Sequence, residues 1–298
     1  MGRERLGRTA SAALKEARRR LSAAGIASAR LDAEVLLAHC LRTTREALLV
    51  EVAARREILL DESARSEFLD LVGMRISREP VAYLVGHKEF WSLDMLVTPA
   101  VLIPRPETEH LVERALAILP PAGRGPLSVI DVGTGSGAIA VALAHERPDV
   151  IVAGVDLSAA ALQVARANAR RHGVEARVHL VQADLLAPFD PARRHDVVVS
   201  NPPYLRGNEE DVLMPDVRDY EPRMALFDDE DGGLIARLVD QASGVLRDDG
   251  WLLMEVATQR SEETLACLSR LPQWRDVGVE EDLAGLPRVV RARRRARR

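Results

Sequence analysis

The sequence contains an Asn-Pro-Pro-Tyr segment whose side chains could hold a planar nitrogen for reaction. Residues Asn201 to Tyr204 directly follow the apolar run DVVVS. Consecutive prolines remove backbone donors and leave carbonyl groups free, while Asn201 offers a side-chain carbonyl and Tyr204 a stacking face. Hydrogen bonds from an amide or amine N–H to Asn201 and to the Pro202 carbonyl would aim the nitrogen lone pair at a methyl group. We therefore predict N-methyl transfer with Asn201, Pro202 and Tyr204 as catalytic residues, and with Pro203 beside them in the substrate site.

A second motif, DVGTGSG at residues 131–137, lies after a predicted strand and at the start of a predicted helix. Glycines permit a tight turn and let backbone N–H groups approach a nucleotide-like ligand at a helix N-terminus. Asp156 ends the next predicted strand, where it could accept hydrogen bonds from ribose hydroxyls. These features indicate a nucleoside cofactor, and up to this point they fit a nicotinamide enzyme as well.

The spacing of the glycines favours S-adenosylmethionine over a dinucleotide. The loop reads G-x-G-x-G and follows the acidic Asp131. A pyrophosphate requires a third glycine one residue later and no adjacent negative charge, whereas a sulfonium brings a positive charge. At the end of the following strand, Asp184 could accept from the adenine amino group and Leu185 could cover the ring. The predicted cofactor-binding residues are Asp131, Gly133, Thr134, Gly135, Ser136, Gly137, Asp156, Asp184, Leu185 and Asn201.

The elements that must position these residues alternate between strands and helices from residue 127 onward. This alternation predicts an α/β fold, a doubly wound, mostly parallel Rossmann-like sheet. The segments VGVEEDLAG and LPRVVRA predict a terminal antiparallel hairpin. Residues 9–78 instead carry apolar positions at helical spacing, and they predict a small helical bundle. Candidate helix starts in this part are Ser28, Thr44, Asp61 and Ser66.

Between these two parts, Gly86, Phe90, Trp91 and the β-rich run LVTPAVLI predict a linking β-hairpin. The expected organisation is a helical domain over 1–79, a hairpin linker over 80–105 and a methyltransferase domain over 106–298. The helical domain carries no chemical motif, so we expect it to dock the substrate.

Composition excludes several classes of protein. The 298 residues are 47% apolar and 29% charged, as in a soluble globular protein of about two domains. The uncharged stretch 132–145 is shorter than the roughly 18 apolar residues of a membrane span, and the N-terminus lacks the apolar region of a signal peptide. We therefore expect a cytoplasmic protein without a membrane partner. Cys40 and Cys267 lie in apolar periodic segments, which favours buried thiols, and no metal is expected.

Charge is distributed unevenly along the chain. Six of the 41 basic residues are arginines of the segment 291–298, so the remaining 35 face 45 acidic residues. The acidic body disfavours binding to duplex nucleic acid. We expect the arginine-rich segment to be a solvated, disordered tail, although it could contact RNA or an acidic partner.

Four segments together resemble the HemK-type N5-glutamine methyltransferases of peptide chain release factors. They are LIPRPETE at 102–109, DVGTGSGAIA, SNPPYL and the terminal DLAGLPRVV. The resemblance implies S-adenosylmethionine as cofactor, the glutamine of the Gly-Gly-Gln loop as substrate and release factors as partners. It assigns the substrate glutamine to residues 201–204. We also place Arg105 and Glu107 in the substrate site, or alternatively in an ion pair at a helix start.

Three other functions compete with this reading. The first is methylation of a ribosomal protein glutamine, which the LIPRPETE element disfavours. The second is methylation of adenine in nucleic acid, which the acidic body disfavours. The third is a non-catalytic cofactor-binding module, which the complete Asn-Pro-Pro-Tyr segment disfavours.

Overall fold

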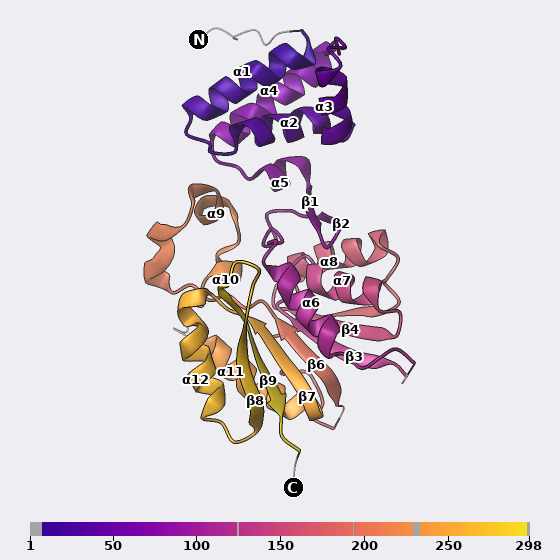
Figure 1. The fold of residues 1–298 in the computed structure, drawn as a ribbon, viewed down its shortest axis with the longest axis vertical. Coiled ribbons are helices and arrows are strands. Elements are labelled where there is room, and N and C mark those ends of the chain that lie inside the picture. The colour runs from indigo at the N-terminus through magenta and orange to yellow at the C-terminus, as the bar shows by residue number, and fades with distance from the viewer. Residues whose placement is uncertain (1–7, 124, 193, 229–232, 297–298) are drawn as a thin grey trace. The chain divides into compact units, whose positions relative to one another are not determined.

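The computed structural model describes residues 8–123, 125–192, 194–228 and 233–296, and the chain divides into two compact units. The first unit combines Met1–Gly86 with Met214–Tyr220, and the second combines His87–Leu213 with Glu221–Arg298 (Figure 1). In the described part of the chain, no helix has both the length and the apolarity to cross a membrane.

The first unit is helical, as predicted. Its helices are α1 (Ala10–Ala23), α2 (Ala29–Cys40), α3 (Arg45–Ala53), α4 (Glu62–Ile76), α5 (Val81–Val85) and α9 (Pro215–Tyr220). The apolar faces of α1, α2 and α4 meet in one core, whose largest buried side chains include Leu21, Leu36 and Phe68. This burial, rather than helix propensity, supplies most of the stability of such short helices.

Two of the four candidate helix starts are confirmed as side-chain caps. The Thr44 hydroxyl accepts from the Ala47 N–H at 3.1 Å, and the Asp61 carboxylate accepts from the Ala64 N–H at 2.7 Å. Ser28 occupies the cap position of α2 without a side-chain hydrogen bond. Ser66 is wrong as a start because α4 already begins at Glu62, with Asp61 as its N-cap.

Helix α9 joins the first unit through polar contacts. The buried guanidinium of Arg75 pairs with Asp32 at 2.7 Å and with Asp216 at 3.3 Å. The Tyr220 hydroxyl donates to the Ser77 carbonyl at 2.7 Å. These contacts place a segment from late in the chain beside the N-terminal helices.

The second unit contains the predicted mostly parallel sheet. Its strand order is β5-β4-β3-β6-β7-β9-β8, with parallel pairing from β5 to β7 and antiparallel pairing at β9 and β8. The strands are β3 (Leu127–Val132), β4 (Val150–Asp156), β5 (Val178–Gln182), β6 (His195–Ser200), β7 (Leu246–Glu255), β8 (Trp274–Glu281) and β9 (Pro287–Arg294). The parallel strands read as apolar runs because helices cover both faces.

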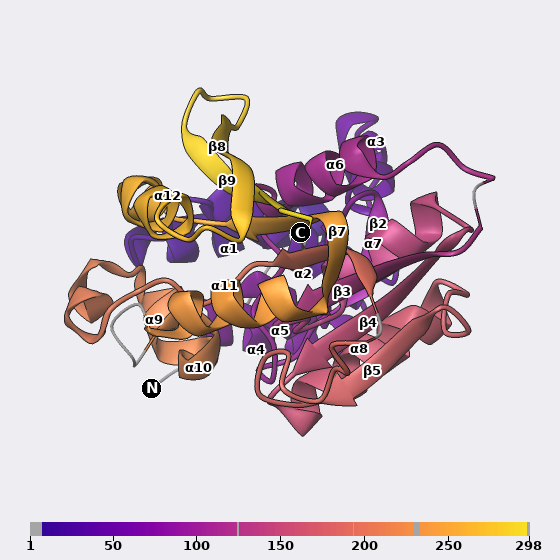
Figure 2. The same cartoon turned by 90° about the horizontal axis from the view of Figure 1, so that it is seen from below.

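Alternate side chains of these strands enter two separate cores. One core packs Val129, Val197 and Leu253 against α6 and α7, and the other packs Ile130 and Val198 against α11. Figure 2 shows α6 and α11 on opposite sides of the sheet. The helices of this unit are α6 (Thr108–Ile118), α7 (Ala138–Glu146), α8 (Ala159–Arg171), α10 (Arg223–Leu226), α11 (Gly233–Val245) and α12 (Ser261–Ser269), with 3-10 turns η1 (Gly207–Val212) and η2 (Thr258–Arg260).

The linking segment is a hairpin only in part. Strands β1 (His87–Phe90) and β2 (Leu93–Leu96) pair antiparallel, whereas residues 81–85 form the helix α5. Gly86 ends α5 in the left-handed conformation that glycine favours.

The prediction of a disordered arginine-rich tail is wrong for residues 291–294, which continue strand β9. Ala292 and Arg294 are buried, and β9 pairs with both β7 and β8. The arginines are accommodated because acidic side chains face them: Arg291 pairs with Glu280 at 3.0 Å, and Arg294 pairs with Asp248. Residues 297–298 lie outside the described residues.

Candidate active site

The DVGTGSG loop connects the end of β3 to the start of α7. Gly133, Gly135 and Gly137 all have positive φ, which side chains rarely adopt. A Cβ on Gly137 would also lie 3.0 Å from the Cβ of Ala165 on α8. The glycines are therefore required by backbone conformation and by the close approach of a neighbouring helix.

Asp131 lies beneath this loop and holds its shape. The side chain is fully buried, and one carboxylate oxygen accepts from the Thr134 hydroxyl at 2.6 Å and from the Ala140 N–H at 3.2 Å. Burial raises the pKa of Asp131 to about 7. Asp131, Thr134, Ser136 and Gly137, all predicted to bind the cofactor, do not line the cavity above the loop.

Asp156 does line the cavity, at the carboxyl end of β4. Its two oxygens accept from the Gly135 N–H at 2.8 Å and from the Ser158 N–H at 2.9 Å. Burial raises the pKa of Asp156, and the backbone hydrogen bonds act against that rise. Each carboxylate oxygen keeps a further lone pair, so the side chain can still accept hydroxyl donors.

The cavity combines apolar walls with acidic groups at the ends of strands. Predicted residues that line it are Gly133, Gly135, Asp156, Asp184, Leu185 and Asn201. Asp184 is half exposed and pairs with Arg237, while Leu185 is buried and has a φ of 49°. Bulky residues rarely adopt this conformation, and such strain concentrates at functional sites. Apolar walls suit an adenine ring and Asp156 suits ribose hydroxyls, so the residues present fit S-adenosylmethionine.

The Asn-Pro-Pro-Tyr segment follows β6 and borders the same cavity. Asn201, Pro202 and Pro203 line it. The Ser200 hydroxyl donates to the Val132 carbonyl at 2.8 Å, which fixes the end of β6 to the start of the glycine loop. Asn201 Nδ2 donates to the Thr108 hydroxyl at 3.1 Å. The predicted substrate residues and cofactor loop therefore meet at one edge of the sheet.

Tyr204 lines a neighbouring cavity instead. This second cavity, of about 230 Å³, also receives Arg206, Arg260 and Glu263. Burial and the nearby Glu255 raise the pKa of the Tyr204 hydroxyl. The Asn-Pro-Pro-Tyr segment thus contributes side chains to both cavities.

Two buried polar residues at this edge were not predicted as site residues. Thr108 begins α6, Glu255 ends β7, and both side chains are buried. Burial raises the pKa of Glu255 to about 7. An acidic residue in the apolar run WLLMEV is the sequence signal that could have revealed Glu255.

Arg105 and Glu107 do not line the cofactor cavity. Arg105 pairs with the buried Glu221 at 2.5 Å, and Glu221 also accepts from the Ile103 N–H at 3.1 Å. Glu107 is exposed at the N-cap position of α6, where it makes no capping hydrogen bond through its side chain. The pair of Arg105 with Glu221 fixes the segment that leads into α6.

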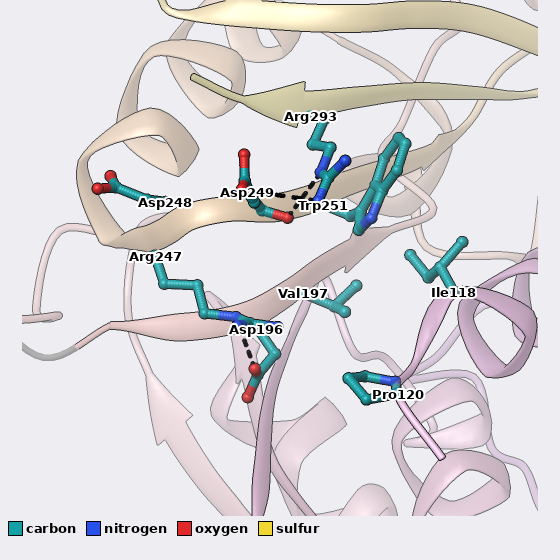
Figure 3. Close-up of a pocket in the computed structure, with 9 residues that line it drawn as sticks. All are labelled: Ile118, Pro120, Asp196, Val197, Arg247, Asp248, Asp249, Trp251 and Arg293. Atoms are coloured by element: carbon teal, nitrogen blue, oxygen red, sulfur yellow. Dashed lines mark hydrogen bonds and ion pairs between the residues drawn. The ribbon is translucent and has the colours of Figure 1, made fainter. Parts of the chain in front are cut away.

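A third cavity, of about 320 Å³, lies at the amino ends of β6 and β7 (Figure 3). Arg247 pairs there with Asp196 at 2.8 Å, and Arg293 pairs with Asp249 at 3.7 Å. Trp251 lies beneath the Arg293 guanidinium at 5.5 Å. The lining of this third cavity includes none of the predicted site residues. Parallel sheets of this type bind ligands at the opposite, carboxyl ends of their strands.

Two known protein families match parts of the chain. Residues 12–86 match the family described as PrmC N-terminal domain, and residues 115–216 match the family described as Methyltransferase small domain. Among solved structures, a methyltransferase from Pyrococcus furiosus superposes with a TM-score of 0.50 at 17% identity, covering 70% of this chain and 92% of that one. This likeness concerns the fold.

Two curated relatives match nearly the whole chain. The release factor glutamine methyltransferase of Nitratidesulfovibrio vulgaris is 41% identical over 283 residues, with 94% of each chain covered. The protein of the same name from Koribacter versatilis is 42% identical over 287 residues, covering 96% of this chain and 99% of the relative. With a matching fold and a site at the expected edge of the sheet, the chain belongs to the release factor glutamine methyltransferase family.

Proposed function

We propose that this protein transfers a methyl group from S-adenosylmethionine to the side-chain amide nitrogen, N5, of the glutamine in the Gly-Gly-Gln loop of peptide chain release factors. The proposal places its activity in the cytoplasm, where release factors act. The observation that carries it is the meeting of the Asn-Pro-Pro-Tyr segment with the cofactor cavity.

The cofactor supplies an electrophilic methyl group. The role of the protein is to hold the poorly nucleophilic amide nitrogen of the glutamine in line with this methyl group. Orientation is the main way to accelerate such a transfer. Asn201 and the Pro202 carbonyl are the acceptors for the two N–H groups of the glutamine amide. Hydrogen bonds to both would orient the amide plane and stabilise positive charge that develops on the nitrogen.

The cofactor would be held by the glycine loop and the acidic residues of the cavity. Asp156 is the acceptor for ribose hydroxyls, and Leu185 lies in the wall available to the adenine ring. The fixed contacts of Asp156 to the loop mean that the acceptor is in place before the ligand binds.

The experiment that tests this function offers the protein a choice of methyl acceptors. The protein is incubated with methyl-labelled cofactor and, in separate reactions, a release factor, a ribosomal protein with an accessible glutamine, and duplex DNA. Label in the release factor is expected. Label in DNA or in the ribosomal protein would overturn the proposal, and absence of label from every acceptor would indicate a module that binds the cofactor without transferring its methyl group.

A further inference from the structure

A chain of three polar side chains connects the substrate site to the interior of the second unit. Asn201 follows β6, Thr108 begins α6 and Glu255 ends β7. Asn201 Nδ2 lies 3.1 Å from the Thr108 hydroxyl oxygen, and the Thr108 hydroxyl lies close enough to Glu255 to lower the pKa of its carboxyl group. Thr108 and Glu255 are both buried, so water does not replace these contacts.

The chemistry of these three side chains allows hydrogen bonds to be donated in only one direction, from Asn201 to Thr108 and from Thr108 to Glu255. An amide nitrogen only donates, so the Thr108 oxygen accepts from Asn201. The single proton of the Thr108 hydroxyl is then available for Glu255, whose carboxylate only accepts. An ionised Glu255 therefore fixes the Thr108 proton, and the Thr108 lone pair fixes the Asn201 amide.

The direction matters because the Asn201 amide has two ends of opposite character. With Nδ2 held by Thr108, Oδ1 is the end left for the substrate, and it accepts hydrogen bonds. In the flipped amide, the NH₂ group would meet the N–H groups of the glutamine, and neither could accept. The reversal would remove an oriented contact from the reacting nitrogen.

We infer that Thr108 and Glu255 are positioning residues that hold the Asn201 side-chain oxygen toward the glutamine amide. This role rests on the proposed function, since it concerns the same methyl transfer. Neither residue needs to touch the glutamine or the cofactor, because both act through Asn201.

Charged and titratable groups from several elements lie near Glu255. Arg105 and Glu107 precede α6, Arg288 extends from β9, and the Tyr204 hydroxyl lies on the loop after β6. Burial raises the pKa of Glu255 to about 7, with Glu107 adding to the rise, while Thr108, Arg288 and Arg105 act against it. Glu255 Oε2 has no hydrogen-bond partner among the described residues. Protonation below this pKa would let Glu255 donate to Thr108 and would permit the flipped amide.

The test compares isosteric and conservative substitutions in the full-length protein. Thr108→Val removes the hydroxyl, and kcat toward a release factor should fall about 10- to 100-fold, as when an oriented catalytic contact is disturbed. The KM for the release factor and the Kd for S-adenosylmethionine should stay within about threefold, because ground-state binding does not use the hydroxyl. Thr108→Ser restores the hydroxyl and should recover most of kcat. A kcat for Thr108→Val within about twofold of the wild type, or no recovery in Thr108→Ser, would overturn the inference.

A second measurement does not depend on the Thr108 variants. The wild-type kcat should fall as the pH drops from about 8 to about 6, through the pKa of Glu255. Glu255→Gln cannot titrate, so its profile should lose this fall. Identical profiles for both proteins would contradict the inference while leaving the proposed function intact. A wild-type protein that fails to label the release factor would instead overturn the proposed function and the inference with it.

Discussion

At the scale of single residues, the proposed chemistry depends most directly on Asn201. Its side chain is fixed by Thr108 and lines the cofactor cavity. Asn201→Ala should lower kcat by about 100-fold or more, because one oriented contact to the reacting amide is lost. Cofactor affinity, measured by calorimetry, should change only a few fold.

A matched control is Asn208→Ala, which removes the same side chain from an exposed position on η1. Its turnover should equal that of the wild type. Near-normal turnover of Asn201→Ala would show that Asn201 is a structural residue and that another group orients the amide.

Asp156 is the residue expected to determine cofactor affinity. Asp156→Ala removes the carboxylate that is available to ribose hydroxyls and also releases the Gly135 N–H. We expect S-adenosylmethionine binding to weaken by about 1–3 kcal/mol, the range for loss of a charge-assisted partner. Calorimetric titration measures this loss. Asp190→Ala, at an exposed acidic position outside the cavity, should bind like the wild type; an equal loss in both variants would argue against the ribose assignment.

Asp131 should make stability depend on pH in the direction opposite to that of a paired carboxylate. The pKa of Asp131 is about 7 in the folded protein, against the ordinary value of 3.8. Between pH 3.8 and about 7 the folded protein therefore keeps the proton on Asp131, whereas the unfolded chain loses it. Stability contributed by this group is therefore lost as the pH rises from about 4 to about 7. Asp131→Asn should lessen that loss by about 2–4 kcal/mol, at 1.36 kcal/mol per pH unit. Urea unfolding of both proteins across this pH range checks it, and parallel pH curves would contradict the expectation.

At the scale of elements, the glycine loop depends on a close approach of α8 to the start of α7. Gly137 has a φ of 80°, and an added Cβ would meet the Cβ and Cα of Ala165 at 3.0 and 3.2 Å. Gly137→Ala should destabilise the protein by about 1–3 kcal/mol through strain and overpacking. Gly244→Ala, within α11 and with open space around it, should instead stabilise by about 0.5–1 kcal/mol. Denaturant unfolding of the two variants distinguishes these signs, and equal effects would refute the packing argument.

The order of the main helices and strands could be predicted because it depends on local sequence patterns. Apolar runs bounded by turn residues indicated the parallel strands, and DVGTGSG indicated the turn between β3 and α7. The continuation of β9 through Arg294 could not be predicted from the run of arginines. It depends on acidic partners such as Asp248 and Glu280, which lie far away in the sequence.

The same reason limited the prediction of the site. Residues 201–203 and Asp156 form recognisable motifs and meet at one cavity. Thr108 reaches Asn201, and Glu255 lies near Thr108, only because α6 and β7 pack beside β6, so no local spacing reveals this arrangement. The association of Met214–Tyr220 with the helical unit likewise depends on the distant Arg75.

At the scale of the whole molecule, the helical unit offers no chemical motif, and we expect it to dock the release factor. Recognition of one protein among many requires an interface of ~800 Å² per partner, more than a small cleft supplies. A truncated protein that begins at His87 should bind S-adenosylmethionine but lose about 10-fold or more in kcat/KM toward intact release factor. Steady-state kinetics give the kcat/KM, and calorimetry with the cofactor also checks folding, since truncation removes the partners of Met214–Tyr220.

A short peptide that carries the Gly-Gly-Gln sequence serves as the control for this truncation. The full-length and truncated proteins should methylate the peptide at equal rates, because a peptide lacks the surface that docks. Equal kcat/KM of the two proteins toward intact release factor would defeat the docking hypothesis.

The position of the transferred methyl group reports directly on the proposed reaction. A release factor treated with the protein and S-adenosylmethionine is digested, and its peptides are fragmented in a mass spectrometer. We expect a single added methyl group on the side-chain amide nitrogen of the Gly-Gly-Gln glutamine, and about 100-fold less of it after the same short incubation with the Asn201→Ala protein. A methyl group on any other residue, or an unmodified glutamine after treatment with active protein, would contradict it.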